Sequence, residues 1–275
     1  MPMPEKTLPE NGYVHGYSAR ESERLADQAQ TLTDLLHHDT HYPTGSRVLE
    51  AGCGIGAQTL ILAKNSPEAQ ITSIDISVQS LKKAEANVKK QGLSNVTFRQ
   101  ADIFNLPFEP GSFDHIFVCF VLEHLADPRR ALEQFRPLLV EGGTITVIEG
   151  DHGSAYFHPD NADAHRAIDC LVELQRQGGG NALIGRQLFP LVAAAGFREV
   201  SVTPRMVYVD SSRPALVKGF TNLTFTAMVG GVGPEVEKQG LMSREAWERG
   251  IAALYRTAEA DGVFCYTFFK ATARK

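Results

Sequence analysis

Short apolar runs alternate with amphipathic stretches along the chain. After a proline-containing stretch over residues 1–12, apolar positions recur at helical spacing from Ser18 to His38, which predicts a helix. From there onward, near-continuous apolar runs predict strands buried on both faces: Arg47–Ala51, Gln70–Asp75, Val96–Gln100, His115–Phe120 and Thr144–Glu149. Helical periodicity fills the segments between them: Gln58–Asn65, Ser77–Gln91 and Pro128–Leu139. This alternation predicts an α/β fold with a doubly wound, mainly parallel sheet.

The pattern loosens after the fifth predicted strand. We expect helices over Asp160–Gln177 and Arg186–Ala195, and strands over Phe197–Thr203 and Val263–Ala273. Residues 205–260 show two or three helical stretches separated by a glycine-rich break.

The composition narrows the classes of function. With 275 residues, 43% of them hydrophobic, the chain can bury a sizeable core. Lys and Arg number 27 against 32 Asp and Glu, a formal charge of −5 without a basic block, so we expect no nucleic-acid partner. The longest strongly apolar run, Ile116–Leu122, is far shorter than the roughly 20 residues that span a bilayer. The opening Met-Pro-Met-Pro-Glu-Lys leads into no apolar segment of a secretory signal. We therefore expect a soluble, cytoplasmic protein without a membrane partner.

Metal and disulfide chemistry find little support. His37 and His41 have a spacing that can bind a metal, but no companion motif accompanies them, so we expect no metal. The cysteines are far apart, form no CxxC pair, and are expected to be reduced packing residues: Cys53, Cys119, Cys170 and Cys265.

Glycines and carboxylates cluster where the predicted strands end. Gly52, Gly54 and Gly56 follow the first strand and lead into a helix, a turn that lets a ligand approach the backbone. By itself this turn is ambiguous, because it also satisfies the loose dinucleotide-binding pattern. Asp75 ends the second strand and Asp102 follows the third, and ligands of open α/β sheets bind beyond these carboxyl ends. Asp75 could bridge two ribose hydroxyls, or either aspartate could cap a helix.

Together, in order and spacing, these motifs resemble the class I S-adenosylmethionine-dependent methyltransferases. The matching segments are VLEAGCGIG (48–56), SIDIS (73–77), ADIFNLPFEPGSFD (101–114), FVLEHLADPRRALEQFRPLL (120–139) and EGGTITVIE (141–149). The resemblance implies a seven-stranded, Rossmann-like sheet whose last strand is inserted antiparallel beside the fifth. It also implies S-adenosylmethionine as cofactor and S-adenosylhomocysteine as product. One departure is Val-Glu-Gly-Gly at 140–143, where a Lys-Pro-Gly-Gly turn is commoner, and it concerns a loop.

The resemblance also implies which residues hold the cofactor. Those expected near its methionine part and sulfonium are Tyr17, Glu50, Gly52, Cys53, Gly54, Cys119 and Phe120. Those expected at the ribose and adenine are Asp75, Ile76, Asp102 and Ile103. His124 could line the pocket or cap the following helix, and Glu50 could instead be a buried strand carboxylate without a ligand.

Methyl transfer from a sulfonium is an in-line displacement, so the protein mainly orients the reactants and excludes water. Where the acceptor must lose a proton, His152 after the fifth strand is the candidate base, and the alternative is a polar capping loop over residues 149–154. Tyr17 and Arg20 could reach the cofactor carboxylate from a lid, or belong to an exposed amphipathic helix. The aromatic content of residues 205–260 favours a small apolar or aromatic acceptor.

We thus expect an N-terminal tail and lid helix (1–44), a cofactor-binding core (45–204), a helical substrate cap (205–260) and a terminal strand that returns to the sheet (261–275). The expected function is methyl transfer to a small molecule. A non-catalytic S-adenosylmethionine-binding sensor or partner subunit would preserve the same motifs. A nicotinamide-dependent oxidoreductase would need a Tyr-Lys or Cys/His constellation, which we do not find downstream. The acceptor, its reacting atom and the oligomeric state, monomer or homodimer, stay open.

Overall fold

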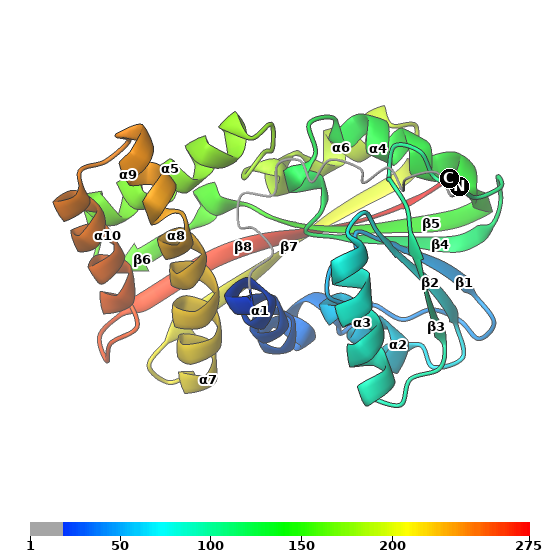
Figure 1. Ribbon diagram of the computed structural model, residues 1–275, viewed down its shortest axis with the longest axis horizontal. Coiled ribbons are helices and arrows are strands. Elements are labelled where there is room, and N and C mark those ends of the chain that lie inside the picture. Colours follow the sequence, from blue (N-terminus) through cyan, green and yellow to red (C-terminus); the bar gives the residue numbers. More distant parts are fainter. Residues whose placement is uncertain (1–18) are drawn as a thin grey trace, which may run out of the picture.

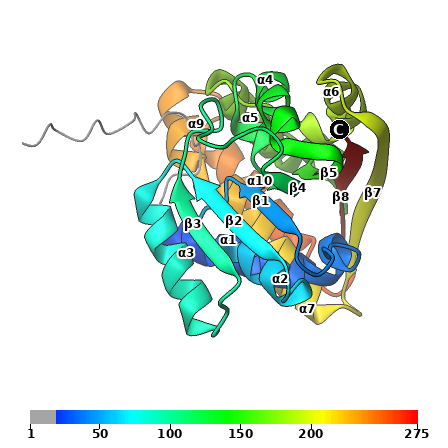
Figure 2. The ribbon, with the colours of Figure 1, turned by 90° about the vertical axis from the view of Figure 1, so that its right-hand side faces the viewer.

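The computed structural model describes residues 19–275 and arranges them around one eight-stranded sheet with helices on both faces (Figures 1 and 2). The parallel part has the order β3-β2-β1-β4-β5, so the direction of winding reverses between β1 and β4. Its strands are β1 (Arg47–Ala51), β2 (Gln70–Asp75), β3 (Val96–Gln100), β4 (Phe113–Cys119) and β5 (Leu139–Gly150). This order confirms the doubly wound arrangement and places the carboxyl ends of β1 and β4 next to each other, at the position where such sheets bind ligands.

A long antiparallel hairpin completes the sheet. It consists of β7 (Arg198–Asp210) and β8 (Val263–Arg274), and β8 is inserted antiparallel beside β5, as the resemblance implied. Pairing of β8 with β5 ends at Gly150 opposite Phe268, so the first half of β8 extends beyond the carboxyl end of β5. There it pairs with the short β6 (Tyr156–His158), which is the strand in excess of the expected seven.

Helices cover the two faces of the sheet. Figure 1 shows α1, α2 and α3 on one side of it and α4, α5 and α6 on the other. The bounds are α1 (Ala19–His37), α2 (Ala57–Asn65), α3 (Val78–Lys90), α4 (Pro128–Phe135), α5 (Ala162–Gln177) and α6 (Leu188–Ala194). Short 3₁₀ turns lie at η1 (Leu122–His124), η2 (Arg136–Leu138), η3 (His152–Ser154) and η4 (Ile184–Gln187).

Side-chain caps fix where several helices begin. Ser77 accepts a hydrogen bond from the backbone of Ser80 at the start of α3, over 3.2 Å. Asp127 does the same at α4, and Asn161 at α5. Each such cap satisfies an N–H group that the helix leaves unpaired, which contributes about 1 kcal/mol.

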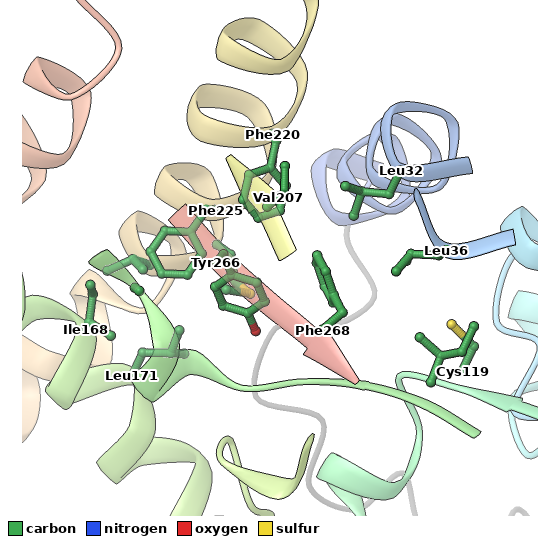
Figure 3. Close-up of a cluster of buried hydrophobic side chains, with 14 of the residues drawn as sticks. Leu32, Leu36, Cys119, Ile168, Leu171, Val207, Phe220, Phe225, Tyr266 and Phe268 are labelled. Atoms are coloured by element: carbon green, nitrogen blue, oxygen red, sulfur yellow. The ribbon is translucent and has the colours of Figure 1, made fainter. Parts of the chain in front are cut away.

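The segment between β7 and β8 is helical, but it begins later than expected because β7 continues to Asp210. It contains α7 (Pro214–Leu216), the π-helix η5 (Val217–Thr226), α8 (Ala227–Gly231), α9 (Gly233–Gln239) and α10 (Arg244–Arg256). Phe220 and Phe225 of η5 pack on Tyr266 and Phe268 of β8, and these rings form part of a core beyond the carboxyl edge of β5 (Figure 3).

A partly buried ion cluster connects the end of α1 to the hairpin. Lys270 of β8, 4% exposed, donates to Asp39 and Thr40 over 2.6 Å each. Arg205 of β7 also pairs with Asp39 and donates to the carbonyl of Leu35. The carboxyl end of α1 is thereby anchored to β7 and β8. No helix within residues 19–275 is long and apolar enough to cross a membrane.

Candidate active site

Glycines shape the turn between β1 and α2. Gly52, Gly54 and Gly56 all have φ in the left-handed region, at 73°, 53° and 80°. A side chain at Gly52 would lie 2.5 Å from a methyl group of Val121, and one at Gly56 would lie 2.9 Å from Ala84. At Gly54, by contrast, no atom lies within 4 Å of the position of a Cβ. Gly52 and Gly56 are thus required by packing, whereas Gly54 faces open space that a ligand can enter.

Asp75, at the end of β2, bonds to this turn. One carboxylate oxygen accepts from the Gly54 backbone and the other from the Ser77 backbone, each over 2.8 Å. Burial raises the pKa of Asp75, while hydrogen bonds from these N–H groups oppose that rise. Since Ser77 is the cap of α3, Asp75 is not that cap itself. The neighbouring Ile76 is 40% exposed, an apolar surface beside an oriented carboxylate.

Glu50 lies beneath the turn, 2% exposed, in the middle of the sheet. Its Oε2 accepts hydrogen bonds of 2.6 Å from both Thr59 and Ser73. Burial raises the pKa of Glu50 to about 7, although the two hydroxyl groups favour the ionised form. The carboxyl group therefore sits near its protonation midpoint at neutral pH.

Asp102 and Ile103 follow β3 and are both partly buried. Asp102 accepts from the backbone of Phe104 over 2.9 Å, within a turn rather than at the start of a helix. The structure therefore places the three carboxyl groups expected at this edge, those of Asp102, Asp75 and Glu50, at the ends of the adjacent strands β3, β2 and β1.

The end of β4 makes a strained turn. Cys119 is buried, and Phe120 has φ of 57°, a conformation that costs a non-glycine residue about 1–2 kcal/mol. Glu149, fully buried at the end of β5, stabilises this turn, because its Oε1 accepts from the backbones of Val121 and Leu122 over 3.0 and 2.7 Å. Burial, followed by repulsion from Glu123, raises the pKa of Glu149 well above its usual range.

An aromatic pocket opens beside this turn. The sheet and the turns that follow β4 and β5 contribute Phe120, Glu123, His124, Gly150, His152, Tyr266 and Phe268. The helices α1, η5 and α8 contribute Arg24, Gln28, Phe220, Thr224, Phe225 and Met228. The pocket adjoins the glycine turn, since Gly52 packs against Val121, the residue after Phe120. His124 lies in the pocket wall, whereas Cys119 and Cys53 do not, and burial raises the pKa of the Cys53 thiol, which disfavours a nucleophilic thiolate there.

His152 is held rigidly in the pocket wall. Its ring is 5% exposed, and Nδ1 and the Tyr266 hydroxyl form a hydrogen bond of 2.7 Å. Nε2 has no hydrogen-bond partner among the residues that the structure describes, and the closest acid, Glu123, lies 4.0 Å away through Oε2. Burial lowers the pKa of His152, so its ring is neutral at neutral pH. The cap of η3 is the adjacent Asp151.

Asp151, Glu123 and Tyr266 were not expected as site residues. Asp151, 2% exposed, forms a two-pronged ion pair with Arg186 of η4 at 2.5 and 2.7 Å. Glu123 accepts at Oε2 from Gln175 of α5 over 3.0 Å. Both acids are visible in the sequence beside expected site residues, but no sequence signal connects Tyr266 to His152.

Two histidines with metal-ligand spacing lie apart from this site, and two further residues fall outside what the structure describes. Tyr17 is outside the described residues, as is the side chain of Arg20. His37 is buried beside Phe117 and its pKa is lowered to about 4 by burial, while His41 is exposed beyond the end of α1. Among the side chains that are described, no cluster of three His, Cys, Asp or Glu could hold a metal ion.

Comparison with known proteins identifies the domain. Residues 44–176 match a family model described as a methyltransferase domain. The chain is 33% identical over 217 residues to an uncharacterised 37.1 kDa protein in transposon TN4556 of Streptomyces fradiae, which covers 78% of this chain and 61% of that protein. It is 26% identical over 237 residues to the methyltransferase str2 of Strobilurus tenacellus, covering 83% of this chain and 82% of that protein.

A solved structure shares the fold. Phosphoethanolamine N-methyltransferase 2 of Haemonchus contortus, in complex with S-adenosylmethionine, superposes with a TM-score of 0.59 at 17% identity, over 100% of this chain and 61% of that one. The chain spans only 35% to 61% of the length of three curated relatives that it matches. Residues 44–176 thus match a methyltransferase domain, and the sheet, whose last strand runs antiparallel beside the fifth, is the one implied by the resemblance to the class I S-adenosylmethionine-dependent methyltransferases.

Proposed function

We propose that this protein transfers a methyl group from S-adenosylmethionine to a small-molecule acceptor. The observation that carries the proposal is the contact between two features, the open glycine turn after β1 and the aromatic pocket. Gly52 of the turn packs directly against Val121, one residue beyond the pocket residue Phe120. A cofactor at the turn and an acceptor in the pocket would therefore be neighbours, as an in-line transfer requires.

The residues present fit the cofactor. Gly54 leaves the space that a Cβ would fill, and the oriented carboxylate of Asp75 suits two ribose hydroxyls. The exposed side chain of Ile76 offers a face for the adenine, with Asp102 and Ile103 past the next strand end. Glu50 supplies negative charge beneath the turn for the ammonium group, through Ser73 and Thr59.

The chain itself contributes positioning, exclusion of water and a proton acceptor. When bound, S-adenosylmethionine supplies a methyl group on a cationic sulfur that leaves as a neutral thioether. Aromatic rings from η5 and β8 exclude water from the pocket, which strengthens the polar interactions within it. The expected base, His152, and the unexpected Glu123 lie 4.0 Å apart in the pocket wall, where one of them can receive the proton that the acceptor loses.

The pocket also supports a small acceptor. Its lining comes from five separate parts of the chain and includes five Phe and Tyr rings, typical of sites that enclose a small apolar ligand. Residues of η5 and α8 line it, which supports the substrate-cap role of residues 205–260. Arg24 and Gln28 line it from α1, which supports a lid role for the N-terminal part.

Calorimetry separates this proposal from the alternatives at the level of binding. We expect micromolar or tighter binding of S-adenosylmethionine and S-adenosylhomocysteine and no binding of NAD. Binding of NAD alone would favour the oxidoreductase. A sensor would bind the first two ligands but would leave labelled methyl groups on the cofactor.

A further inference from the structure

The hydrogen bond between Tyr266 and His152 determines which nitrogen of the imidazole carries the proton. Burial raises the pKa of Tyr266 well above its usual range, so the phenol keeps its proton at any working pH. The nearby Asp151 backbone N–H, which can only donate, offsets part of this rise in the pKa of Tyr266. The hydroxyl proton then needs an acceptor of its own. The phenol hydroxyl points away from η5 (Figure 3), and His152 Nδ1 lies 2.7 Å from it.

Nδ1 of His152 is therefore the acceptor, and in the neutral ring the remaining proton is on Nε2. In the opposite tautomer, Nδ1–H and the phenol O–H would both be donors at the same hydrogen bond. One of these two buried donors would then have no acceptor. That loss disfavours the opposite tautomer by roughly tenfold or more.

The Nε2–H group belongs to a residue of the pocket wall and has no hydrogen-bond partner among the described residues. Glu123 Oε2 is 4.0 Å from Nε2, too far for a direct hydrogen bond. An oxygen atom about 2.8 Å from both atoms would see them at an angle of about 90°, a feasible geometry for a hydroxyl that accepts from one and donates to the other. The gap thus has the polarity of a hydroxyl site, with a donor on one side and a carboxylate on the other.

We propose that the methyl acceptor is a hydroxyl compound, whose oxygen accepts from His152 Nε2–H and whose proton passes to Glu123. This deepens the proposed methyl transfer and rests on it. A hydroxyl oxygen has two lone pairs, so that one can accept the hydrogen bond while the other attacks the methyl group. A neutral amine has only one, and a hydrogen bond from Nε2–H would occupy the lone pair that must react.

The step balances without a further reactant. The acceptor oxygen forms a bond to the methyl carbon while the carbon–sulfur bond breaks and its electron pair goes to sulfur. The hydroxyl proton moves to Glu123 Oε2 and later to solvent. His152 is then a hydrogen-bond donor to the reacting oxygen rather than the base, and Tyr266 is a positioning residue that keeps His152 in this form.

The surrounding rings indicate what carries the hydroxyl. Phe120 and Phe268 lie 5.6 Å apart between ring centroids, and Phe225 faces the His152 ring edge-on at 6.3 Å. These surfaces favour a flat, apolar frame, such as a phenol, over a sugar or a small charged metabolite.

Nitrogen-15 NMR tests the tautomer directly, without an acceptor. The full-length protein, labelled at histidine and saturated with S-adenosylhomocysteine, is examined by long-range proton–nitrogen correlation, and the His152 signals are assigned by their loss in His152→Gln. We expect the proton of His152 on Nε2, loss of this single tautomer in Tyr266→Phe, and no change in Tyr255→Phe, an exposed tyrosine of α10. A proton on Nδ1 in the unaltered protein overturns the assignment, whatever the variants do.

Product analysis tests the acceptor. The protein is incubated with methyl-labelled S-adenosylmethionine and a small-molecule extract of its source organism, and labelled products are identified by mass spectrometry. We expect methyl ethers, with turnover at least 100-fold lower in Glu123→Gln and unchanged in Glu248→Gln, an exposed glutamate of α10.

We also expect Tyr266→Phe to lower kcat about tenfold while the Kd of S-adenosylhomocysteine changes less than twofold. N-methyl products would overturn the hydroxyl proposal but leave methyl transfer intact. The absence of any labelled product, with cofactor bound, would overturn methyl transfer itself.

Discussion

The carboxylate of Asp75, at the end of β2, accepts a hydrogen bond of 2.8 Å from the backbone of Gly54, in the turn after β1. This bond joins the two strand ends on which the proposed cofactor site is built. It orients the carboxylate, and it holds the turn open at Gly54, where the position of a Cβ has no atom within 4 Å.

Asp75→Asn is expected to weaken binding of S-adenosylhomocysteine by about 1–3 kcal/mol, a 5- to 150-fold increase in Kd. An amide group cannot accept from both Gly54 and Ser77 and also bridge two ribose hydroxyls. Calorimetry measures the change, with Asp169→Asn, an exposed position on α5, as the control. Equal affinities for the two variants would remove Asp75 from the site.

Comparing Gly54→Ala with Gly92→Ala distinguishes the loss of space for the ligand from the effect of backbone strain. Gly54→Ala and Gly92→Ala both place a side chain at a left-handed position with no atom within 4 Å, so each should lower the free energy of unfolding by about 1–2 kcal/mol. Only Gly54 lies at the carboxyl edge, whereas Gly92 precedes β3 at the opposite edge. We expect at least a tenfold loss of S-adenosylhomocysteine affinity in Gly54→Ala alone. A similar loss in both variants would point to strain instead.

Cofactor binding should depend on pH through Glu50, whose pKa is about 7. Below that pH the group is mostly protonated, and it must release a proton to face the ammonium of the cofactor. Affinity is thus expected to fall by up to tenfold per unit as the pH drops below 7. Calorimetry at pH 6 in two buffers of different ionisation enthalpy should detect proton release. Glu50→Gln should abolish it, and its persistence in that variant would contradict the assignment.

The same group affects folding with a definite sign. Since the pKa of Glu50 rises from 4.5 when unfolded to about 7 when folded, its favourable contribution is complete below pH 4.5 and is lost as the pH rises through 7. Urea titrations should show Glu50→Gln gaining stability relative to the unaltered protein between pH 5 and pH 8. A constant difference across this range would contradict the pKa shift.

Arg186 is expected to stabilise the loop that contains His152. Removing it in Arg186→Ala leaves the buried carboxylate of Asp151 without its counter-ion, at a cost of about 1–3 kcal/mol, because the arginine itself is half exposed. Denaturant titration compares it with Arg176→Ala, which breaks an exposed pair on α5 and should cost less than about 0.5 kcal/mol. If the two variants lose the same free energy of unfolding, the ion pair with Asp151 contributes no more than an exposed ion pair.

Local patterns were sufficient to predict the parallel half of the sheet. β1, β2 and β3 have the bounds expected from their apolar runs, because each is flanked by a turn and a helix that interrupt the pattern. β7 was predicted seven residues too short at its end, since the residues past Thr203 begin with Pro204 and Arg205, which interrupt the apolar pattern. The strand persists there only because β8 pairs with it as far as Asp210.

In the candidate site, too, some residues could be predicted from the sequence and others could not. Glu50, Asp75 and Asp102 follow strands that are adjacent in a doubly wound sheet, so the topology alone predicts that they share an edge. Tyr266 could not be predicted, because it follows His152 by 114 residues and reaches it through the register that places Phe268 opposite Gly150. The π-helix that presents Phe220 and Phe225 has no sequence signature of its own, and its pattern was indistinguishable from that of an α-helix.

Transfer of label tests the central claim most directly. The protein is incubated with methyl-labelled S-adenosylmethionine and the small-molecule extract, and the recovery of S-adenosylhomocysteine is measured beside the label in the extract. The account predicts equal molar amounts of both, with the transfer lowered at least fivefold by Asp75→Asn at subsaturating cofactor and restored in part at high cofactor. Tight cofactor binding without any label in the extract would contradict it and would favour a sensor.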